Sequence, residues 1–154
     1  MSVIEKKLLE KGIELSSGSM PIANYVSVQR DGNTLYFSGS SALKDGKPVY
    51  QGKLGMEVSI EEGYEAARLA AINLISIMKR EIGDLDKVEQ IIKVMGFVAS
   101  VEDFFSQPSV IDGASDLFVE IFGDKGRHAR SAVGTNVLPM NLPLEIELIV
   151  KIKE

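Results

Sequence analysis

Two residues near the C-terminal end of the sequence, Arg130 and Glu145, could do chemistry together. A guanidinium group is planar and donates two parallel hydrogen bonds, so a fixed arginine suits a small carboxylate. A carboxylate held nearby could take a proton from water or return one. Two strand-like runs, 131–138 and 144–153, would place the pair on neighbouring backbone segments. The pair therefore predicts a site for a small metabolite with a negatively charged end.

Each of these candidates also has a purely structural interpretation. Arg130 could pair with a surface carboxylate, which contributes little to stability. Glu145 and Glu147 could be the solvated face of an edge strand. Tyr25, a further candidate for contact with a ligand, could instead be a core or cross-strand aromatic.

The remaining candidates are interpreted as structural. The sequence offers no partners for a triad with His128, so Arg127 and His128 are expected to make loop or intersubunit contacts. Met78, Met95 and Met140 are expected to fill the core.

The composition restricts the chemistry. The chain has 154 residues, which fits one domain spanning 1–154, with 45% apolar and 25% charged residues. It has no cysteine, which excludes disulfides, thiolate nucleophiles and cysteine-based metal sites. His128 is the sole histidine, so no motif with two histidines can form. A site built only from carboxylates stays open, but no calcium-loop motif is present, and we predict no metal.

The net charge and the hydropathy of the sequence restrict the classes of partner that the protein is expected to bind. The net charge of −5 makes nucleic acid an improbable ligand, since phosphate backbones usually require a basic face. No apolar run approaches the roughly 20 residues that span a bilayer. Residues 1–10 mix charges with apolar positions and do not form a secretory signal. We expect a cytoplasmic protein with no membrane partner.

The first half of the chain contains a helix, a hairpin and a long helix. A short helix over 3–11 and a loop over 16–21 form an N-terminal extension covering 1–20. Strands are predicted at 25–30 and 34–38, joined by a turn at Asp31-Gly32-Asn33. Ser59 and Glu62 fit a capping box that opens a helix ending at Gly83. Its predicted apolar stripe is Tyr64, Ala67, Ala71, Leu74, Ile75 and Met78.

The second half alternates strands and a helix. A strand over 88–101, a helix over 110–122 and the two terminal strands complete an α+β layer, with helices on one face of a mixed sheet. In the last strand the predicted inner face is Leu144, Ile146, Leu148, Val150 and Ile152. Ile149 lies among the charges of the other face, which suggests packing against another subunit.

Several short motifs together resemble the RidA (YjgF) family of reactive-intermediate deaminases. They are Tyr25-Val26, Ser38-Gly39, Ala129-Arg130-Ser131-x-Val133, Leu138-Pro139 and Glu145-Ile146-Glu147. The resemblance runs from Ala23 to Lys151. The segments 111–123 and 126–134 are similar to a slightly longer subgroup whose members are mostly functionally unassigned.

The resemblance implies a chorismate-mutase-like α+β fold that forms a homotrimer with ligand clefts between subunits. It implies that Arg130 binds the carboxylate of a small 2-imino acid and that Glu145 orients or activates water. The other residues expected to contact the substrate are Tyr25, Ser38, Gly39, Ser40 and Ala132. The products would be a 2-keto acid and ammonia, and no cofactor would be needed.

Three positions depart from the family pattern. Ser40 replaces a common glutamine, Ala132 a frequent cysteine and Asp112 a common asparagine, and an insertion surrounds 106–109. The arginine and the glutamate are kept, so imine hydrolysis is the leading hypothesis. A non-catalytic trimer that binds a small carboxylate metabolite is the alternative. Ribonuclease or translation-inhibitor activity ranks third.

Overall fold

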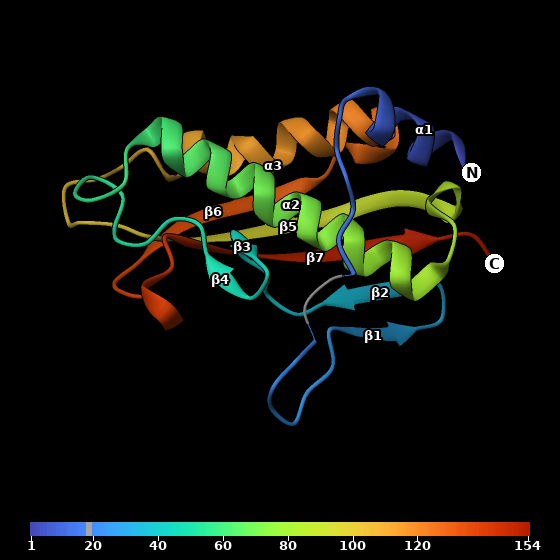
Figure 1. Ribbon diagram of the computed structural model, residues 1–154, viewed down its shortest axis with the longest axis horizontal. Coiled ribbons are helices and arrows are strands. Elements are labelled where there is room, and N and C mark those ends of the chain that lie inside the picture. The colour runs from blue at the N-terminus through green and yellow to red at the C-terminus, as the bar shows by residue number, and fades with distance from the viewer. Residues whose placement is uncertain (18–19) are drawn as a thin grey trace.

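A five-stranded mixed sheet is the centre of the computed structural model, which describes residues 1–17 and 20–154 (Figure 1). Its order is β1-β2-β7-β5-β6. The strands are β1 Val28–Asp31, β2 Thr34–Phe37, β5 Val88–Ala99, β6 Ala129–Thr135 and β7 Leu144–Ile152. β5 and β6 run parallel, whereas the other neighbours are antiparallel. The predicted α+β class is confirmed.

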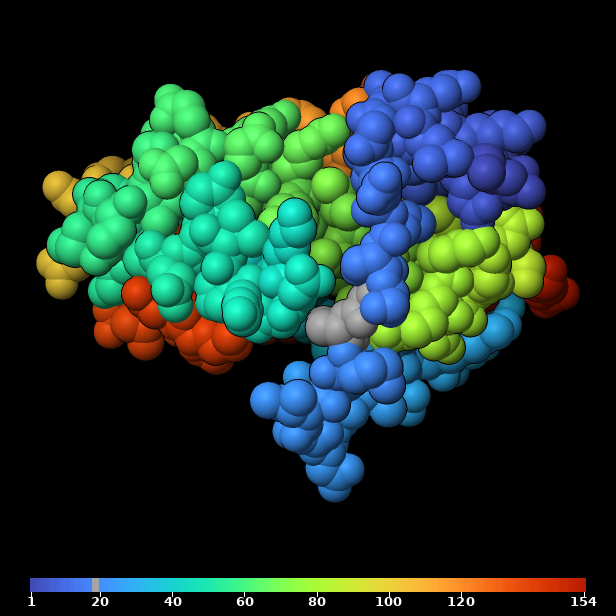
Figure 2. All heavy atoms as spheres, viewed as in Figure 1, coloured from blue at the N-terminus to red at the C-terminus, as the bar shows by residue number. Residues whose placement is uncertain are grey.

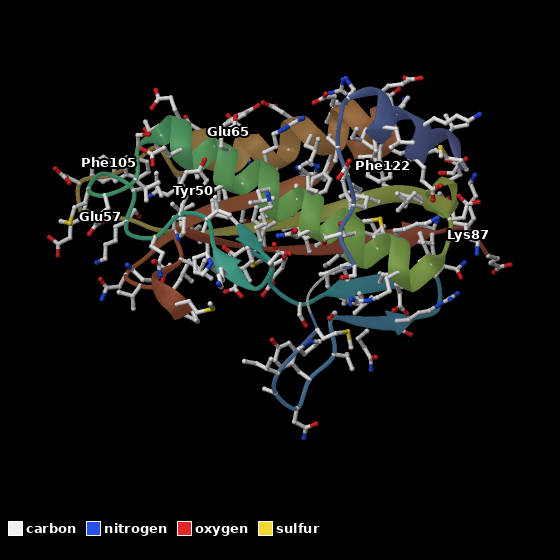
Figure 3. The ribbon with its side chains drawn as sticks, in the orientation of Figure 1. Tyr50, Glu57, Glu65, Lys87, Phe105 and Phe122 are labelled. Carbon is white, nitrogen blue, oxygen red and sulfur yellow. The ribbon has the colours of Figure 1, made fainter. Side chains whose placement is uncertain are left out.

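Two long helices, α2 Ile60–Ile82 and α3 Gln107–Phe122, lie side by side along one face of the sheet (Figure 1). The predicted inner face of β7 is fully buried beneath them, and Phe122 closes the core near α1 (Figure 3). The smaller elements are α1 Val3–Glu10, η1 Leu85–Lys87, η2 Gly123–Gly126, η3 Pro139–Asn141 and the β3–β4 hairpin of Leu43–Lys44 and Lys47–Pro48. No helix formed by the described residues covers the opposite face of the sheet, and we call it the open face.

The ends of α2 agree with the predicted signals, with one difference. Ser59 accepts a hydrogen bond from the backbone amide of Glu62 at 3.1 Å, which confirms the N-cap. The Glu62 carboxylate, however, accepts from the Ser59 hydroxyl at 3.1 Å rather than from its backbone amide. Gly83 ends α2 with a positive φ of 75°, a conformation that glycine adopts without strain.

The predicted bounds of three elements were wrong. β1 begins at Val28, which pairs with Phe37, so Tyr25 and Val26 precede the sheet. α3 begins at Gln107 because Pro108 lies in the first turn, where its missing amide hydrogen is not needed. β6 covers 129–135 rather than 131–138. Residues 18–19 of the expected 16–21 loop lie outside the described residues.

Two expected core residues are placed elsewhere. Met140 is 53% exposed and has a φ of 59°, and Met95 is only partly buried, on the open face, whereas Met78 is buried as predicted. Tyr64 does not complete an apolar stripe, because its hydroxyl donates to Asp116 Oδ2 of α3 at 2.7 Å. The contact between the two long helices is therefore partly polar.

Residues 20–27 form an arm that projects from the body of the molecule (Figures 1 and 2). Ile22 is 101% exposed, Tyr25 57% and Val26 55%, so the arm presents apolar side chains to solvent. Ser38 ties the base of the arm to β2, since its hydroxyl donates to the Val26 carbonyl at 2.6 Å. Within residues 1–17 and 20–154, no helix is long and apolar enough to cross a membrane.

Candidate active site

The first group of predicted site residues gathers where β2 ends beside β7. Ser40 exchanges two backbone hydrogen bonds with Ile146, at 2.9 and 2.8 Å, which brings Gly39 against Glu145. A Cβ atom on Gly39 would lie 2.3 Å from Glu145 Oε1, so only glycine leaves room for this carboxylate. Residues Tyr25, Ser38, Gly39 and Ser40 line a hollow of about 50 Å³. We call these four residues and Glu145 the glutamate half-site.

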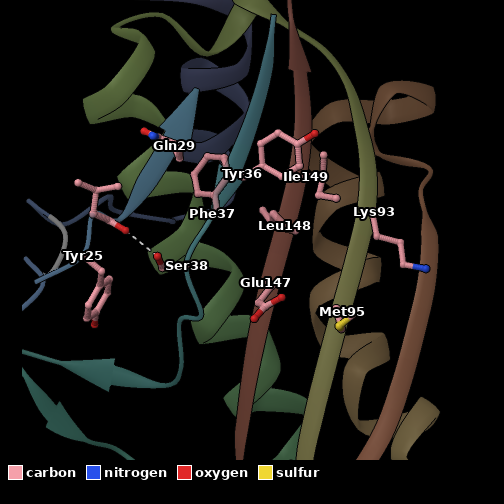
Figure 4. Close-up of a pocket in the computed structure, with 11 residues that line it drawn as sticks. Tyr25, Gln29, Tyr36, Phe37, Ser38, Lys93, Met95, Glu147, Leu148 and Ile149 are labelled. Atoms are coloured by element: carbon pink, nitrogen blue, oxygen red, sulfur yellow. Dashed lines mark hydrogen bonds between the residues drawn. The ribbon is translucent and has the colours of Figure 1, made fainter. Parts of the chain in front are cut away.

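A larger hollow of about 510 Å³ extends across the open face from the same arm (Figure 4). Tyr25 and Ser38 lie at one side of it, and Glu147 and Met95 lie on β7 and β5 (Figure 4). Ile149 also lines this hollow, so the face is not uniformly polar, as the sequence predicted.

Glu145 is set up as a base by its surroundings. It is partly buried, and burial raises the pKa of its carboxyl group above the ordinary value. The like charge of Glu147 raises the pKa further. A glutamate with a raised pKa is a stronger base than a fully solvated one.

The second group of predicted residues lies on β6 and α3. Arg130 donates through Nη1 to Asp112 Oδ1 at 2.7 Å and to Ser115 Oγ at 3.2 Å. Its side chain is 23% exposed. Ala132 lies two residues further along β6 and packs against the core. Both described polar contacts use Nη1, so the Nε–Nη2 edge can receive a carboxylate with two hydrogen bonds. We call Arg130, Ala132, Asp112 and Ser115 the arginine half-site.

His128 is attached to the arginine half-site. Its Nε2 lies 2.8 Å from Ser115 Oγ, and its Nδ1 lies 2.6 Å from the Gly126 carbonyl oxygen. Burial lowers the pKa of His128, and the positive charge of Arg130 lowers it further. Arg127 is exposed and pairs with Asp124 at 3.2 Å in the same loop. The sequence analysis missed Ser115, although its i,i+3 spacing from Asp112 places both on one helix face.

The two half-sites lie on opposite faces of the sheet. Arg130 pairs with Val94, which is buried beneath the helices, and Glu145 pairs with Phe97. Val94 and Phe97 are three residues apart on β5, and alternate strand residues point to opposite faces. The expectation that the two strands are neighbours was wrong, because β5 lies between β6 and β7. One chain therefore does not bring Arg130 and Glu145 together.

No group of three or more histidine, cysteine, aspartate or glutamate residues that could hold a metal ion occurs among residues 1–17 and 20–154.

A mixed sheet with paired helices on one face defines a chorismate-mutase-like α+β protein. Residues 5–151 match the family described as YjgF/chorismate mutase-like, a description that also names endoribonuclease as a candidate activity. The chain belongs to this YjgF family, and the family assignment made from the sequence motifs is confirmed.

Three similar proteins illustrate the range of the family. Protein TCP17 of Trypanosoma cruzi is 37% identical over 150 residues, covering 97% of this chain and 94% of that protein. The crystal structure of Atu1372 from Agrobacterium tumefaciens, a protein of unknown function, has a TM-score of 0.92 and 43% identity, covering 98% of this chain and 93% of that one. A 2-iminobutanoate/2-iminopropanoate deaminase of Dermatophagoides farinae is 29% identical over 138 residues, covering 86% of this chain and 89% of that protein.

Proposed function

We propose that this protein hydrolyses small 2-imino acids to 2-keto acids and ammonia in clefts between the subunits of a homotrimer. Each cleft would combine the arginine half-site of one subunit with the glutamate half-site of the next. The observation that carries this proposal is the placement of Arg130 and Glu145 on opposite faces of the same sheet. A site that needs both residues can be completed only by a second copy of the chain.

The surface of the chain supports an oligomer. Tyr36 and Val133 on the open face are each 46% exposed, and the arm adds Tyr25 and Val26. Exposed apolar side chains of this size on an uncovered sheet face would be suited to a contact with another subunit. In a ring, the same heterologous contact repeats at every subunit, so each interface would form one cleft.

The proposed reaction uses two groups of opposite charge, the guanidinium of Arg130 and the carboxylate of Glu145. The free Nε–Nη2 edge of Arg130 holds the substrate carboxylate, which fixes the C=N carbon near Glu145 of the adjacent subunit. Glu145 accepts a proton as water forms the new C–O bond, and it then returns that proton to the amine nitrogen. Glu145 then carries the hydroxyl proton of the resulting carbinolamine to the amine nitrogen, so the C=O bond forms as the C–N bond breaks, ammonia leaves and the 2-keto acid remains. No redox step occurs, so no electron carrier is required.

The first experiment generates 2-iminobutanoate in solution and follows its decay. Arg130→Ala is expected to slow hydrolysis strongly, whereas Arg127→Ala removes the same charge from an exposed loop position and is expected to behave like the wild type. Equal rates for Arg130→Ala and the wild-type protein would refute the proposal.

A second experiment tests whether the cleft is shared between subunits. Arg130→Ala and Glu145→Gln should each be inactive alone, but a mixed oligomer contains some interfaces with an intact arginine and an intact glutamate. Random mixing gives about one such interface in four, so co-expression should restore roughly a quarter of the wild-type activity. No recovery in a verified mixed oligomer would exclude a shared cleft.

One observation supports the alternative of a non-catalytic binding protein. Asp112 already compensates part of the charge of Arg130, which would weaken the clamp. Thermal stabilisation by 2-oxobutanoate without imine turnover would favour this alternative. Ribonuclease activity remains third, because the net charge is −5 and the arginine half-site itself includes a carboxylate.

A further inference from the structure

The contacts around His128 define a hydrogen-bond chain with one direction. A carbonyl oxygen can only accept, so the proton of the neutral ring lies on Nδ1 and is donated to Gly126. Nε2 then accepts, and the hydroxyl of Ser115 must donate to it. With its proton directed at the histidine, Ser115 presents an oxygen lone pair to Nη1 of Arg130.

We infer that His128 acts through Ser115 as a positioning residue for Arg130, so that the arginine holds a carboxylate ligand best while the imidazole is neutral. This inference deepens the proposed function and rests on it where the ligand is concerned. His128 contacts no substrate in this arrangement. Its effect reaches the ligand only through the orientation of the guanidinium group.

The geometry explains why a second acceptor matters to Arg130. An arginine side chain loses considerable rotamer freedom when it is fixed in one geometry. Asp112 and Ser115, one turn apart on α3, hold the same Nη1 at 2.7 and 3.2 Å and so orient the opposite edge. If the Ser115 hydroxyl were not directed at His128, it could donate to a backbone carbonyl of its own helix. The guanidinium would then be held by Asp112 alone.

Protonation of His128 reverses the direction of the hydrogen bond between His128 and Ser115. The imidazolium donates from both nitrogens, so Ser115 Oγ would accept from two cationic groups at once, Nε2 and Nη1, and the Ser115 proton would lose His128 as its acceptor. Among the described residues, the charged group facing His128 is Arg130 of β6, with the Asp112 carboxylate beyond it. α3 otherwise presents Ser115 and the ring of Phe118, and η2 presents a carbonyl. Repulsion between the imidazolium and the guanidinium would then weaken the contact of Nη1 with Ser115.

Three variants separate the contributions of the ring. His128→Gln can keep an acceptor for Ser115 but does not titrate. His128→Phe keeps the edge-on packing against Phe118, at a centroid distance of 6.0 Å, and removes both nitrogens. Ser115→Ala removes the link and leaves the Asp112 contact in place.

The first measurement needs no ligand. The Nε–H resonance of Arg130 in nitrogen-15 NMR should be sharp while His128 is neutral and should broaden as His128 is protonated. In Ser115→Ala and His128→Phe the resonance should be broad both above and below the pKa of the wild-type His128. In His128→Gln it should be sharp both above and below that pKa. A resonance that stays sharp in Ser115→Ala and His128→Phe would overturn the inference.

The second measurement is binding of 2-oxobutanoate, made in the Glu145→Gln background so that the glutamate proton does not contribute. Affinity should weaken about fivefold as the pH falls through the His128 transition, which corresponds to about 1 kcal/mol lost from the contact that orients the guanidinium group. His128→Gln should remove this pH dependence of binding. In turnover by the protein that retains Glu145, protonation of His128 should raise KM more than it lowers kcat. An unchanged pH dependence in His128→Gln would overturn the inference. If 2-oxobutanoate does not bind at any pH, the proposed function fails, while the NMR measurement still decides the role of His128.

Discussion

Replacing Asp112 with asparagine should strengthen the binding of a small carboxylate. Asp112 Oδ1 lies 2.7 Å from Nη1 of Arg130, where a side-chain amide oxygen could also accept the hydrogen bond. The substitution therefore keeps the contact that orients the guanidinium and removes a negative charge beside the proposed ligand. The resemblance to the RidA family points in the same direction, since asparagine is common at this position.

The size of the effect follows from the distance between the two negative groups. A carboxylate on the Nε–Nη2 edge would lie about 7 Å from Asp112, across the guanidinium, where repulsion is roughly 0.6 kcal/mol in water and about 2.4 kcal/mol at an effective dielectric constant of 20. The Asp112 side chain is 47% exposed, so a value near the lower limit applies. The dissociation constant should fall about threefold, and at most about tenfold at low salt.

The assay is titration calorimetry with 2-oxobutanoate at two ionic strengths. Asp116→Asn is the matched control, because Asp116 lies one turn further along α3, changes the charge equally and contacts Tyr64 rather than Arg130. Asp112→Asn should bind more tightly than Asp116→Asn, and the difference should shrink at high salt. Equal or weaker binding by Asp112→Asn would mean that the charge of Asp112 does not oppose a ligand on Arg130.

Three further variants test other parts of the structure. Gly39→Ala should fold, because its Cβ displaces only the flexible Glu145 side chain, and it should lose imine hydrolysis without loss of 2-oxobutanoate binding. In a chain separated from its partner subunits, Glu145→Gln should raise the melting temperature at neutral pH, since a raised folded-state pKa makes the charged form destabilising; this gain should disappear below the ordinary glutamate pKa. Asp86 accepts from the amides of Ile4 and Val3, which lowers its pKa, so Asp86→Ala should cost about 1 kcal/mol in urea unfolding at pH 7. That cost should vanish as the pH falls through the depressed pKa of Asp86.

The elements with a clear hydrophobic period were predictable from sequence. In β7 every second residue from Leu144 to Ile152 is apolar, and these residues form the buried face. The start of β1 was not predictable in the same way. Tyr25-Val26-Ser27-Val28 alternates like a strand, yet pairing with β2 begins only at Val28, and Val26 receives a side-chain bond from Ser38 instead. The local alternation of apolar residues does not show which backbone groups will pair with a neighbouring strand.

The arrangement of the candidate site residues could not be predicted from sequence. Arg130 and Glu145 follow from motif spacing, whereas their separation depends on β5 inserting between β6 and β7. The contact of Ser115 with His128 joins α3 to the loop before β6 and is likewise a product of tertiary packing. Sequence spacing could place Asp112 and Ser115 on one helix face, but it could not show which strand that face would meet.

The separation of Arg130 from Glu145 has a consequence for the base. On one face of one chain they would form an ion pair, and the pKa of Glu145 would be lowered rather than raised. In a shared cleft, Arg130 of the adjacent subunit would lower that pKa until a ligand carboxylate neutralises the guanidinium. Glu145 would then be the stronger base only when substrate is bound. The acidic limb of kcat, which reports the enzyme–substrate complex, should therefore lie at higher pH than that of kcat/KM, which reports the free enzyme. Coincident limbs would show that the two charges do not meet in one cleft.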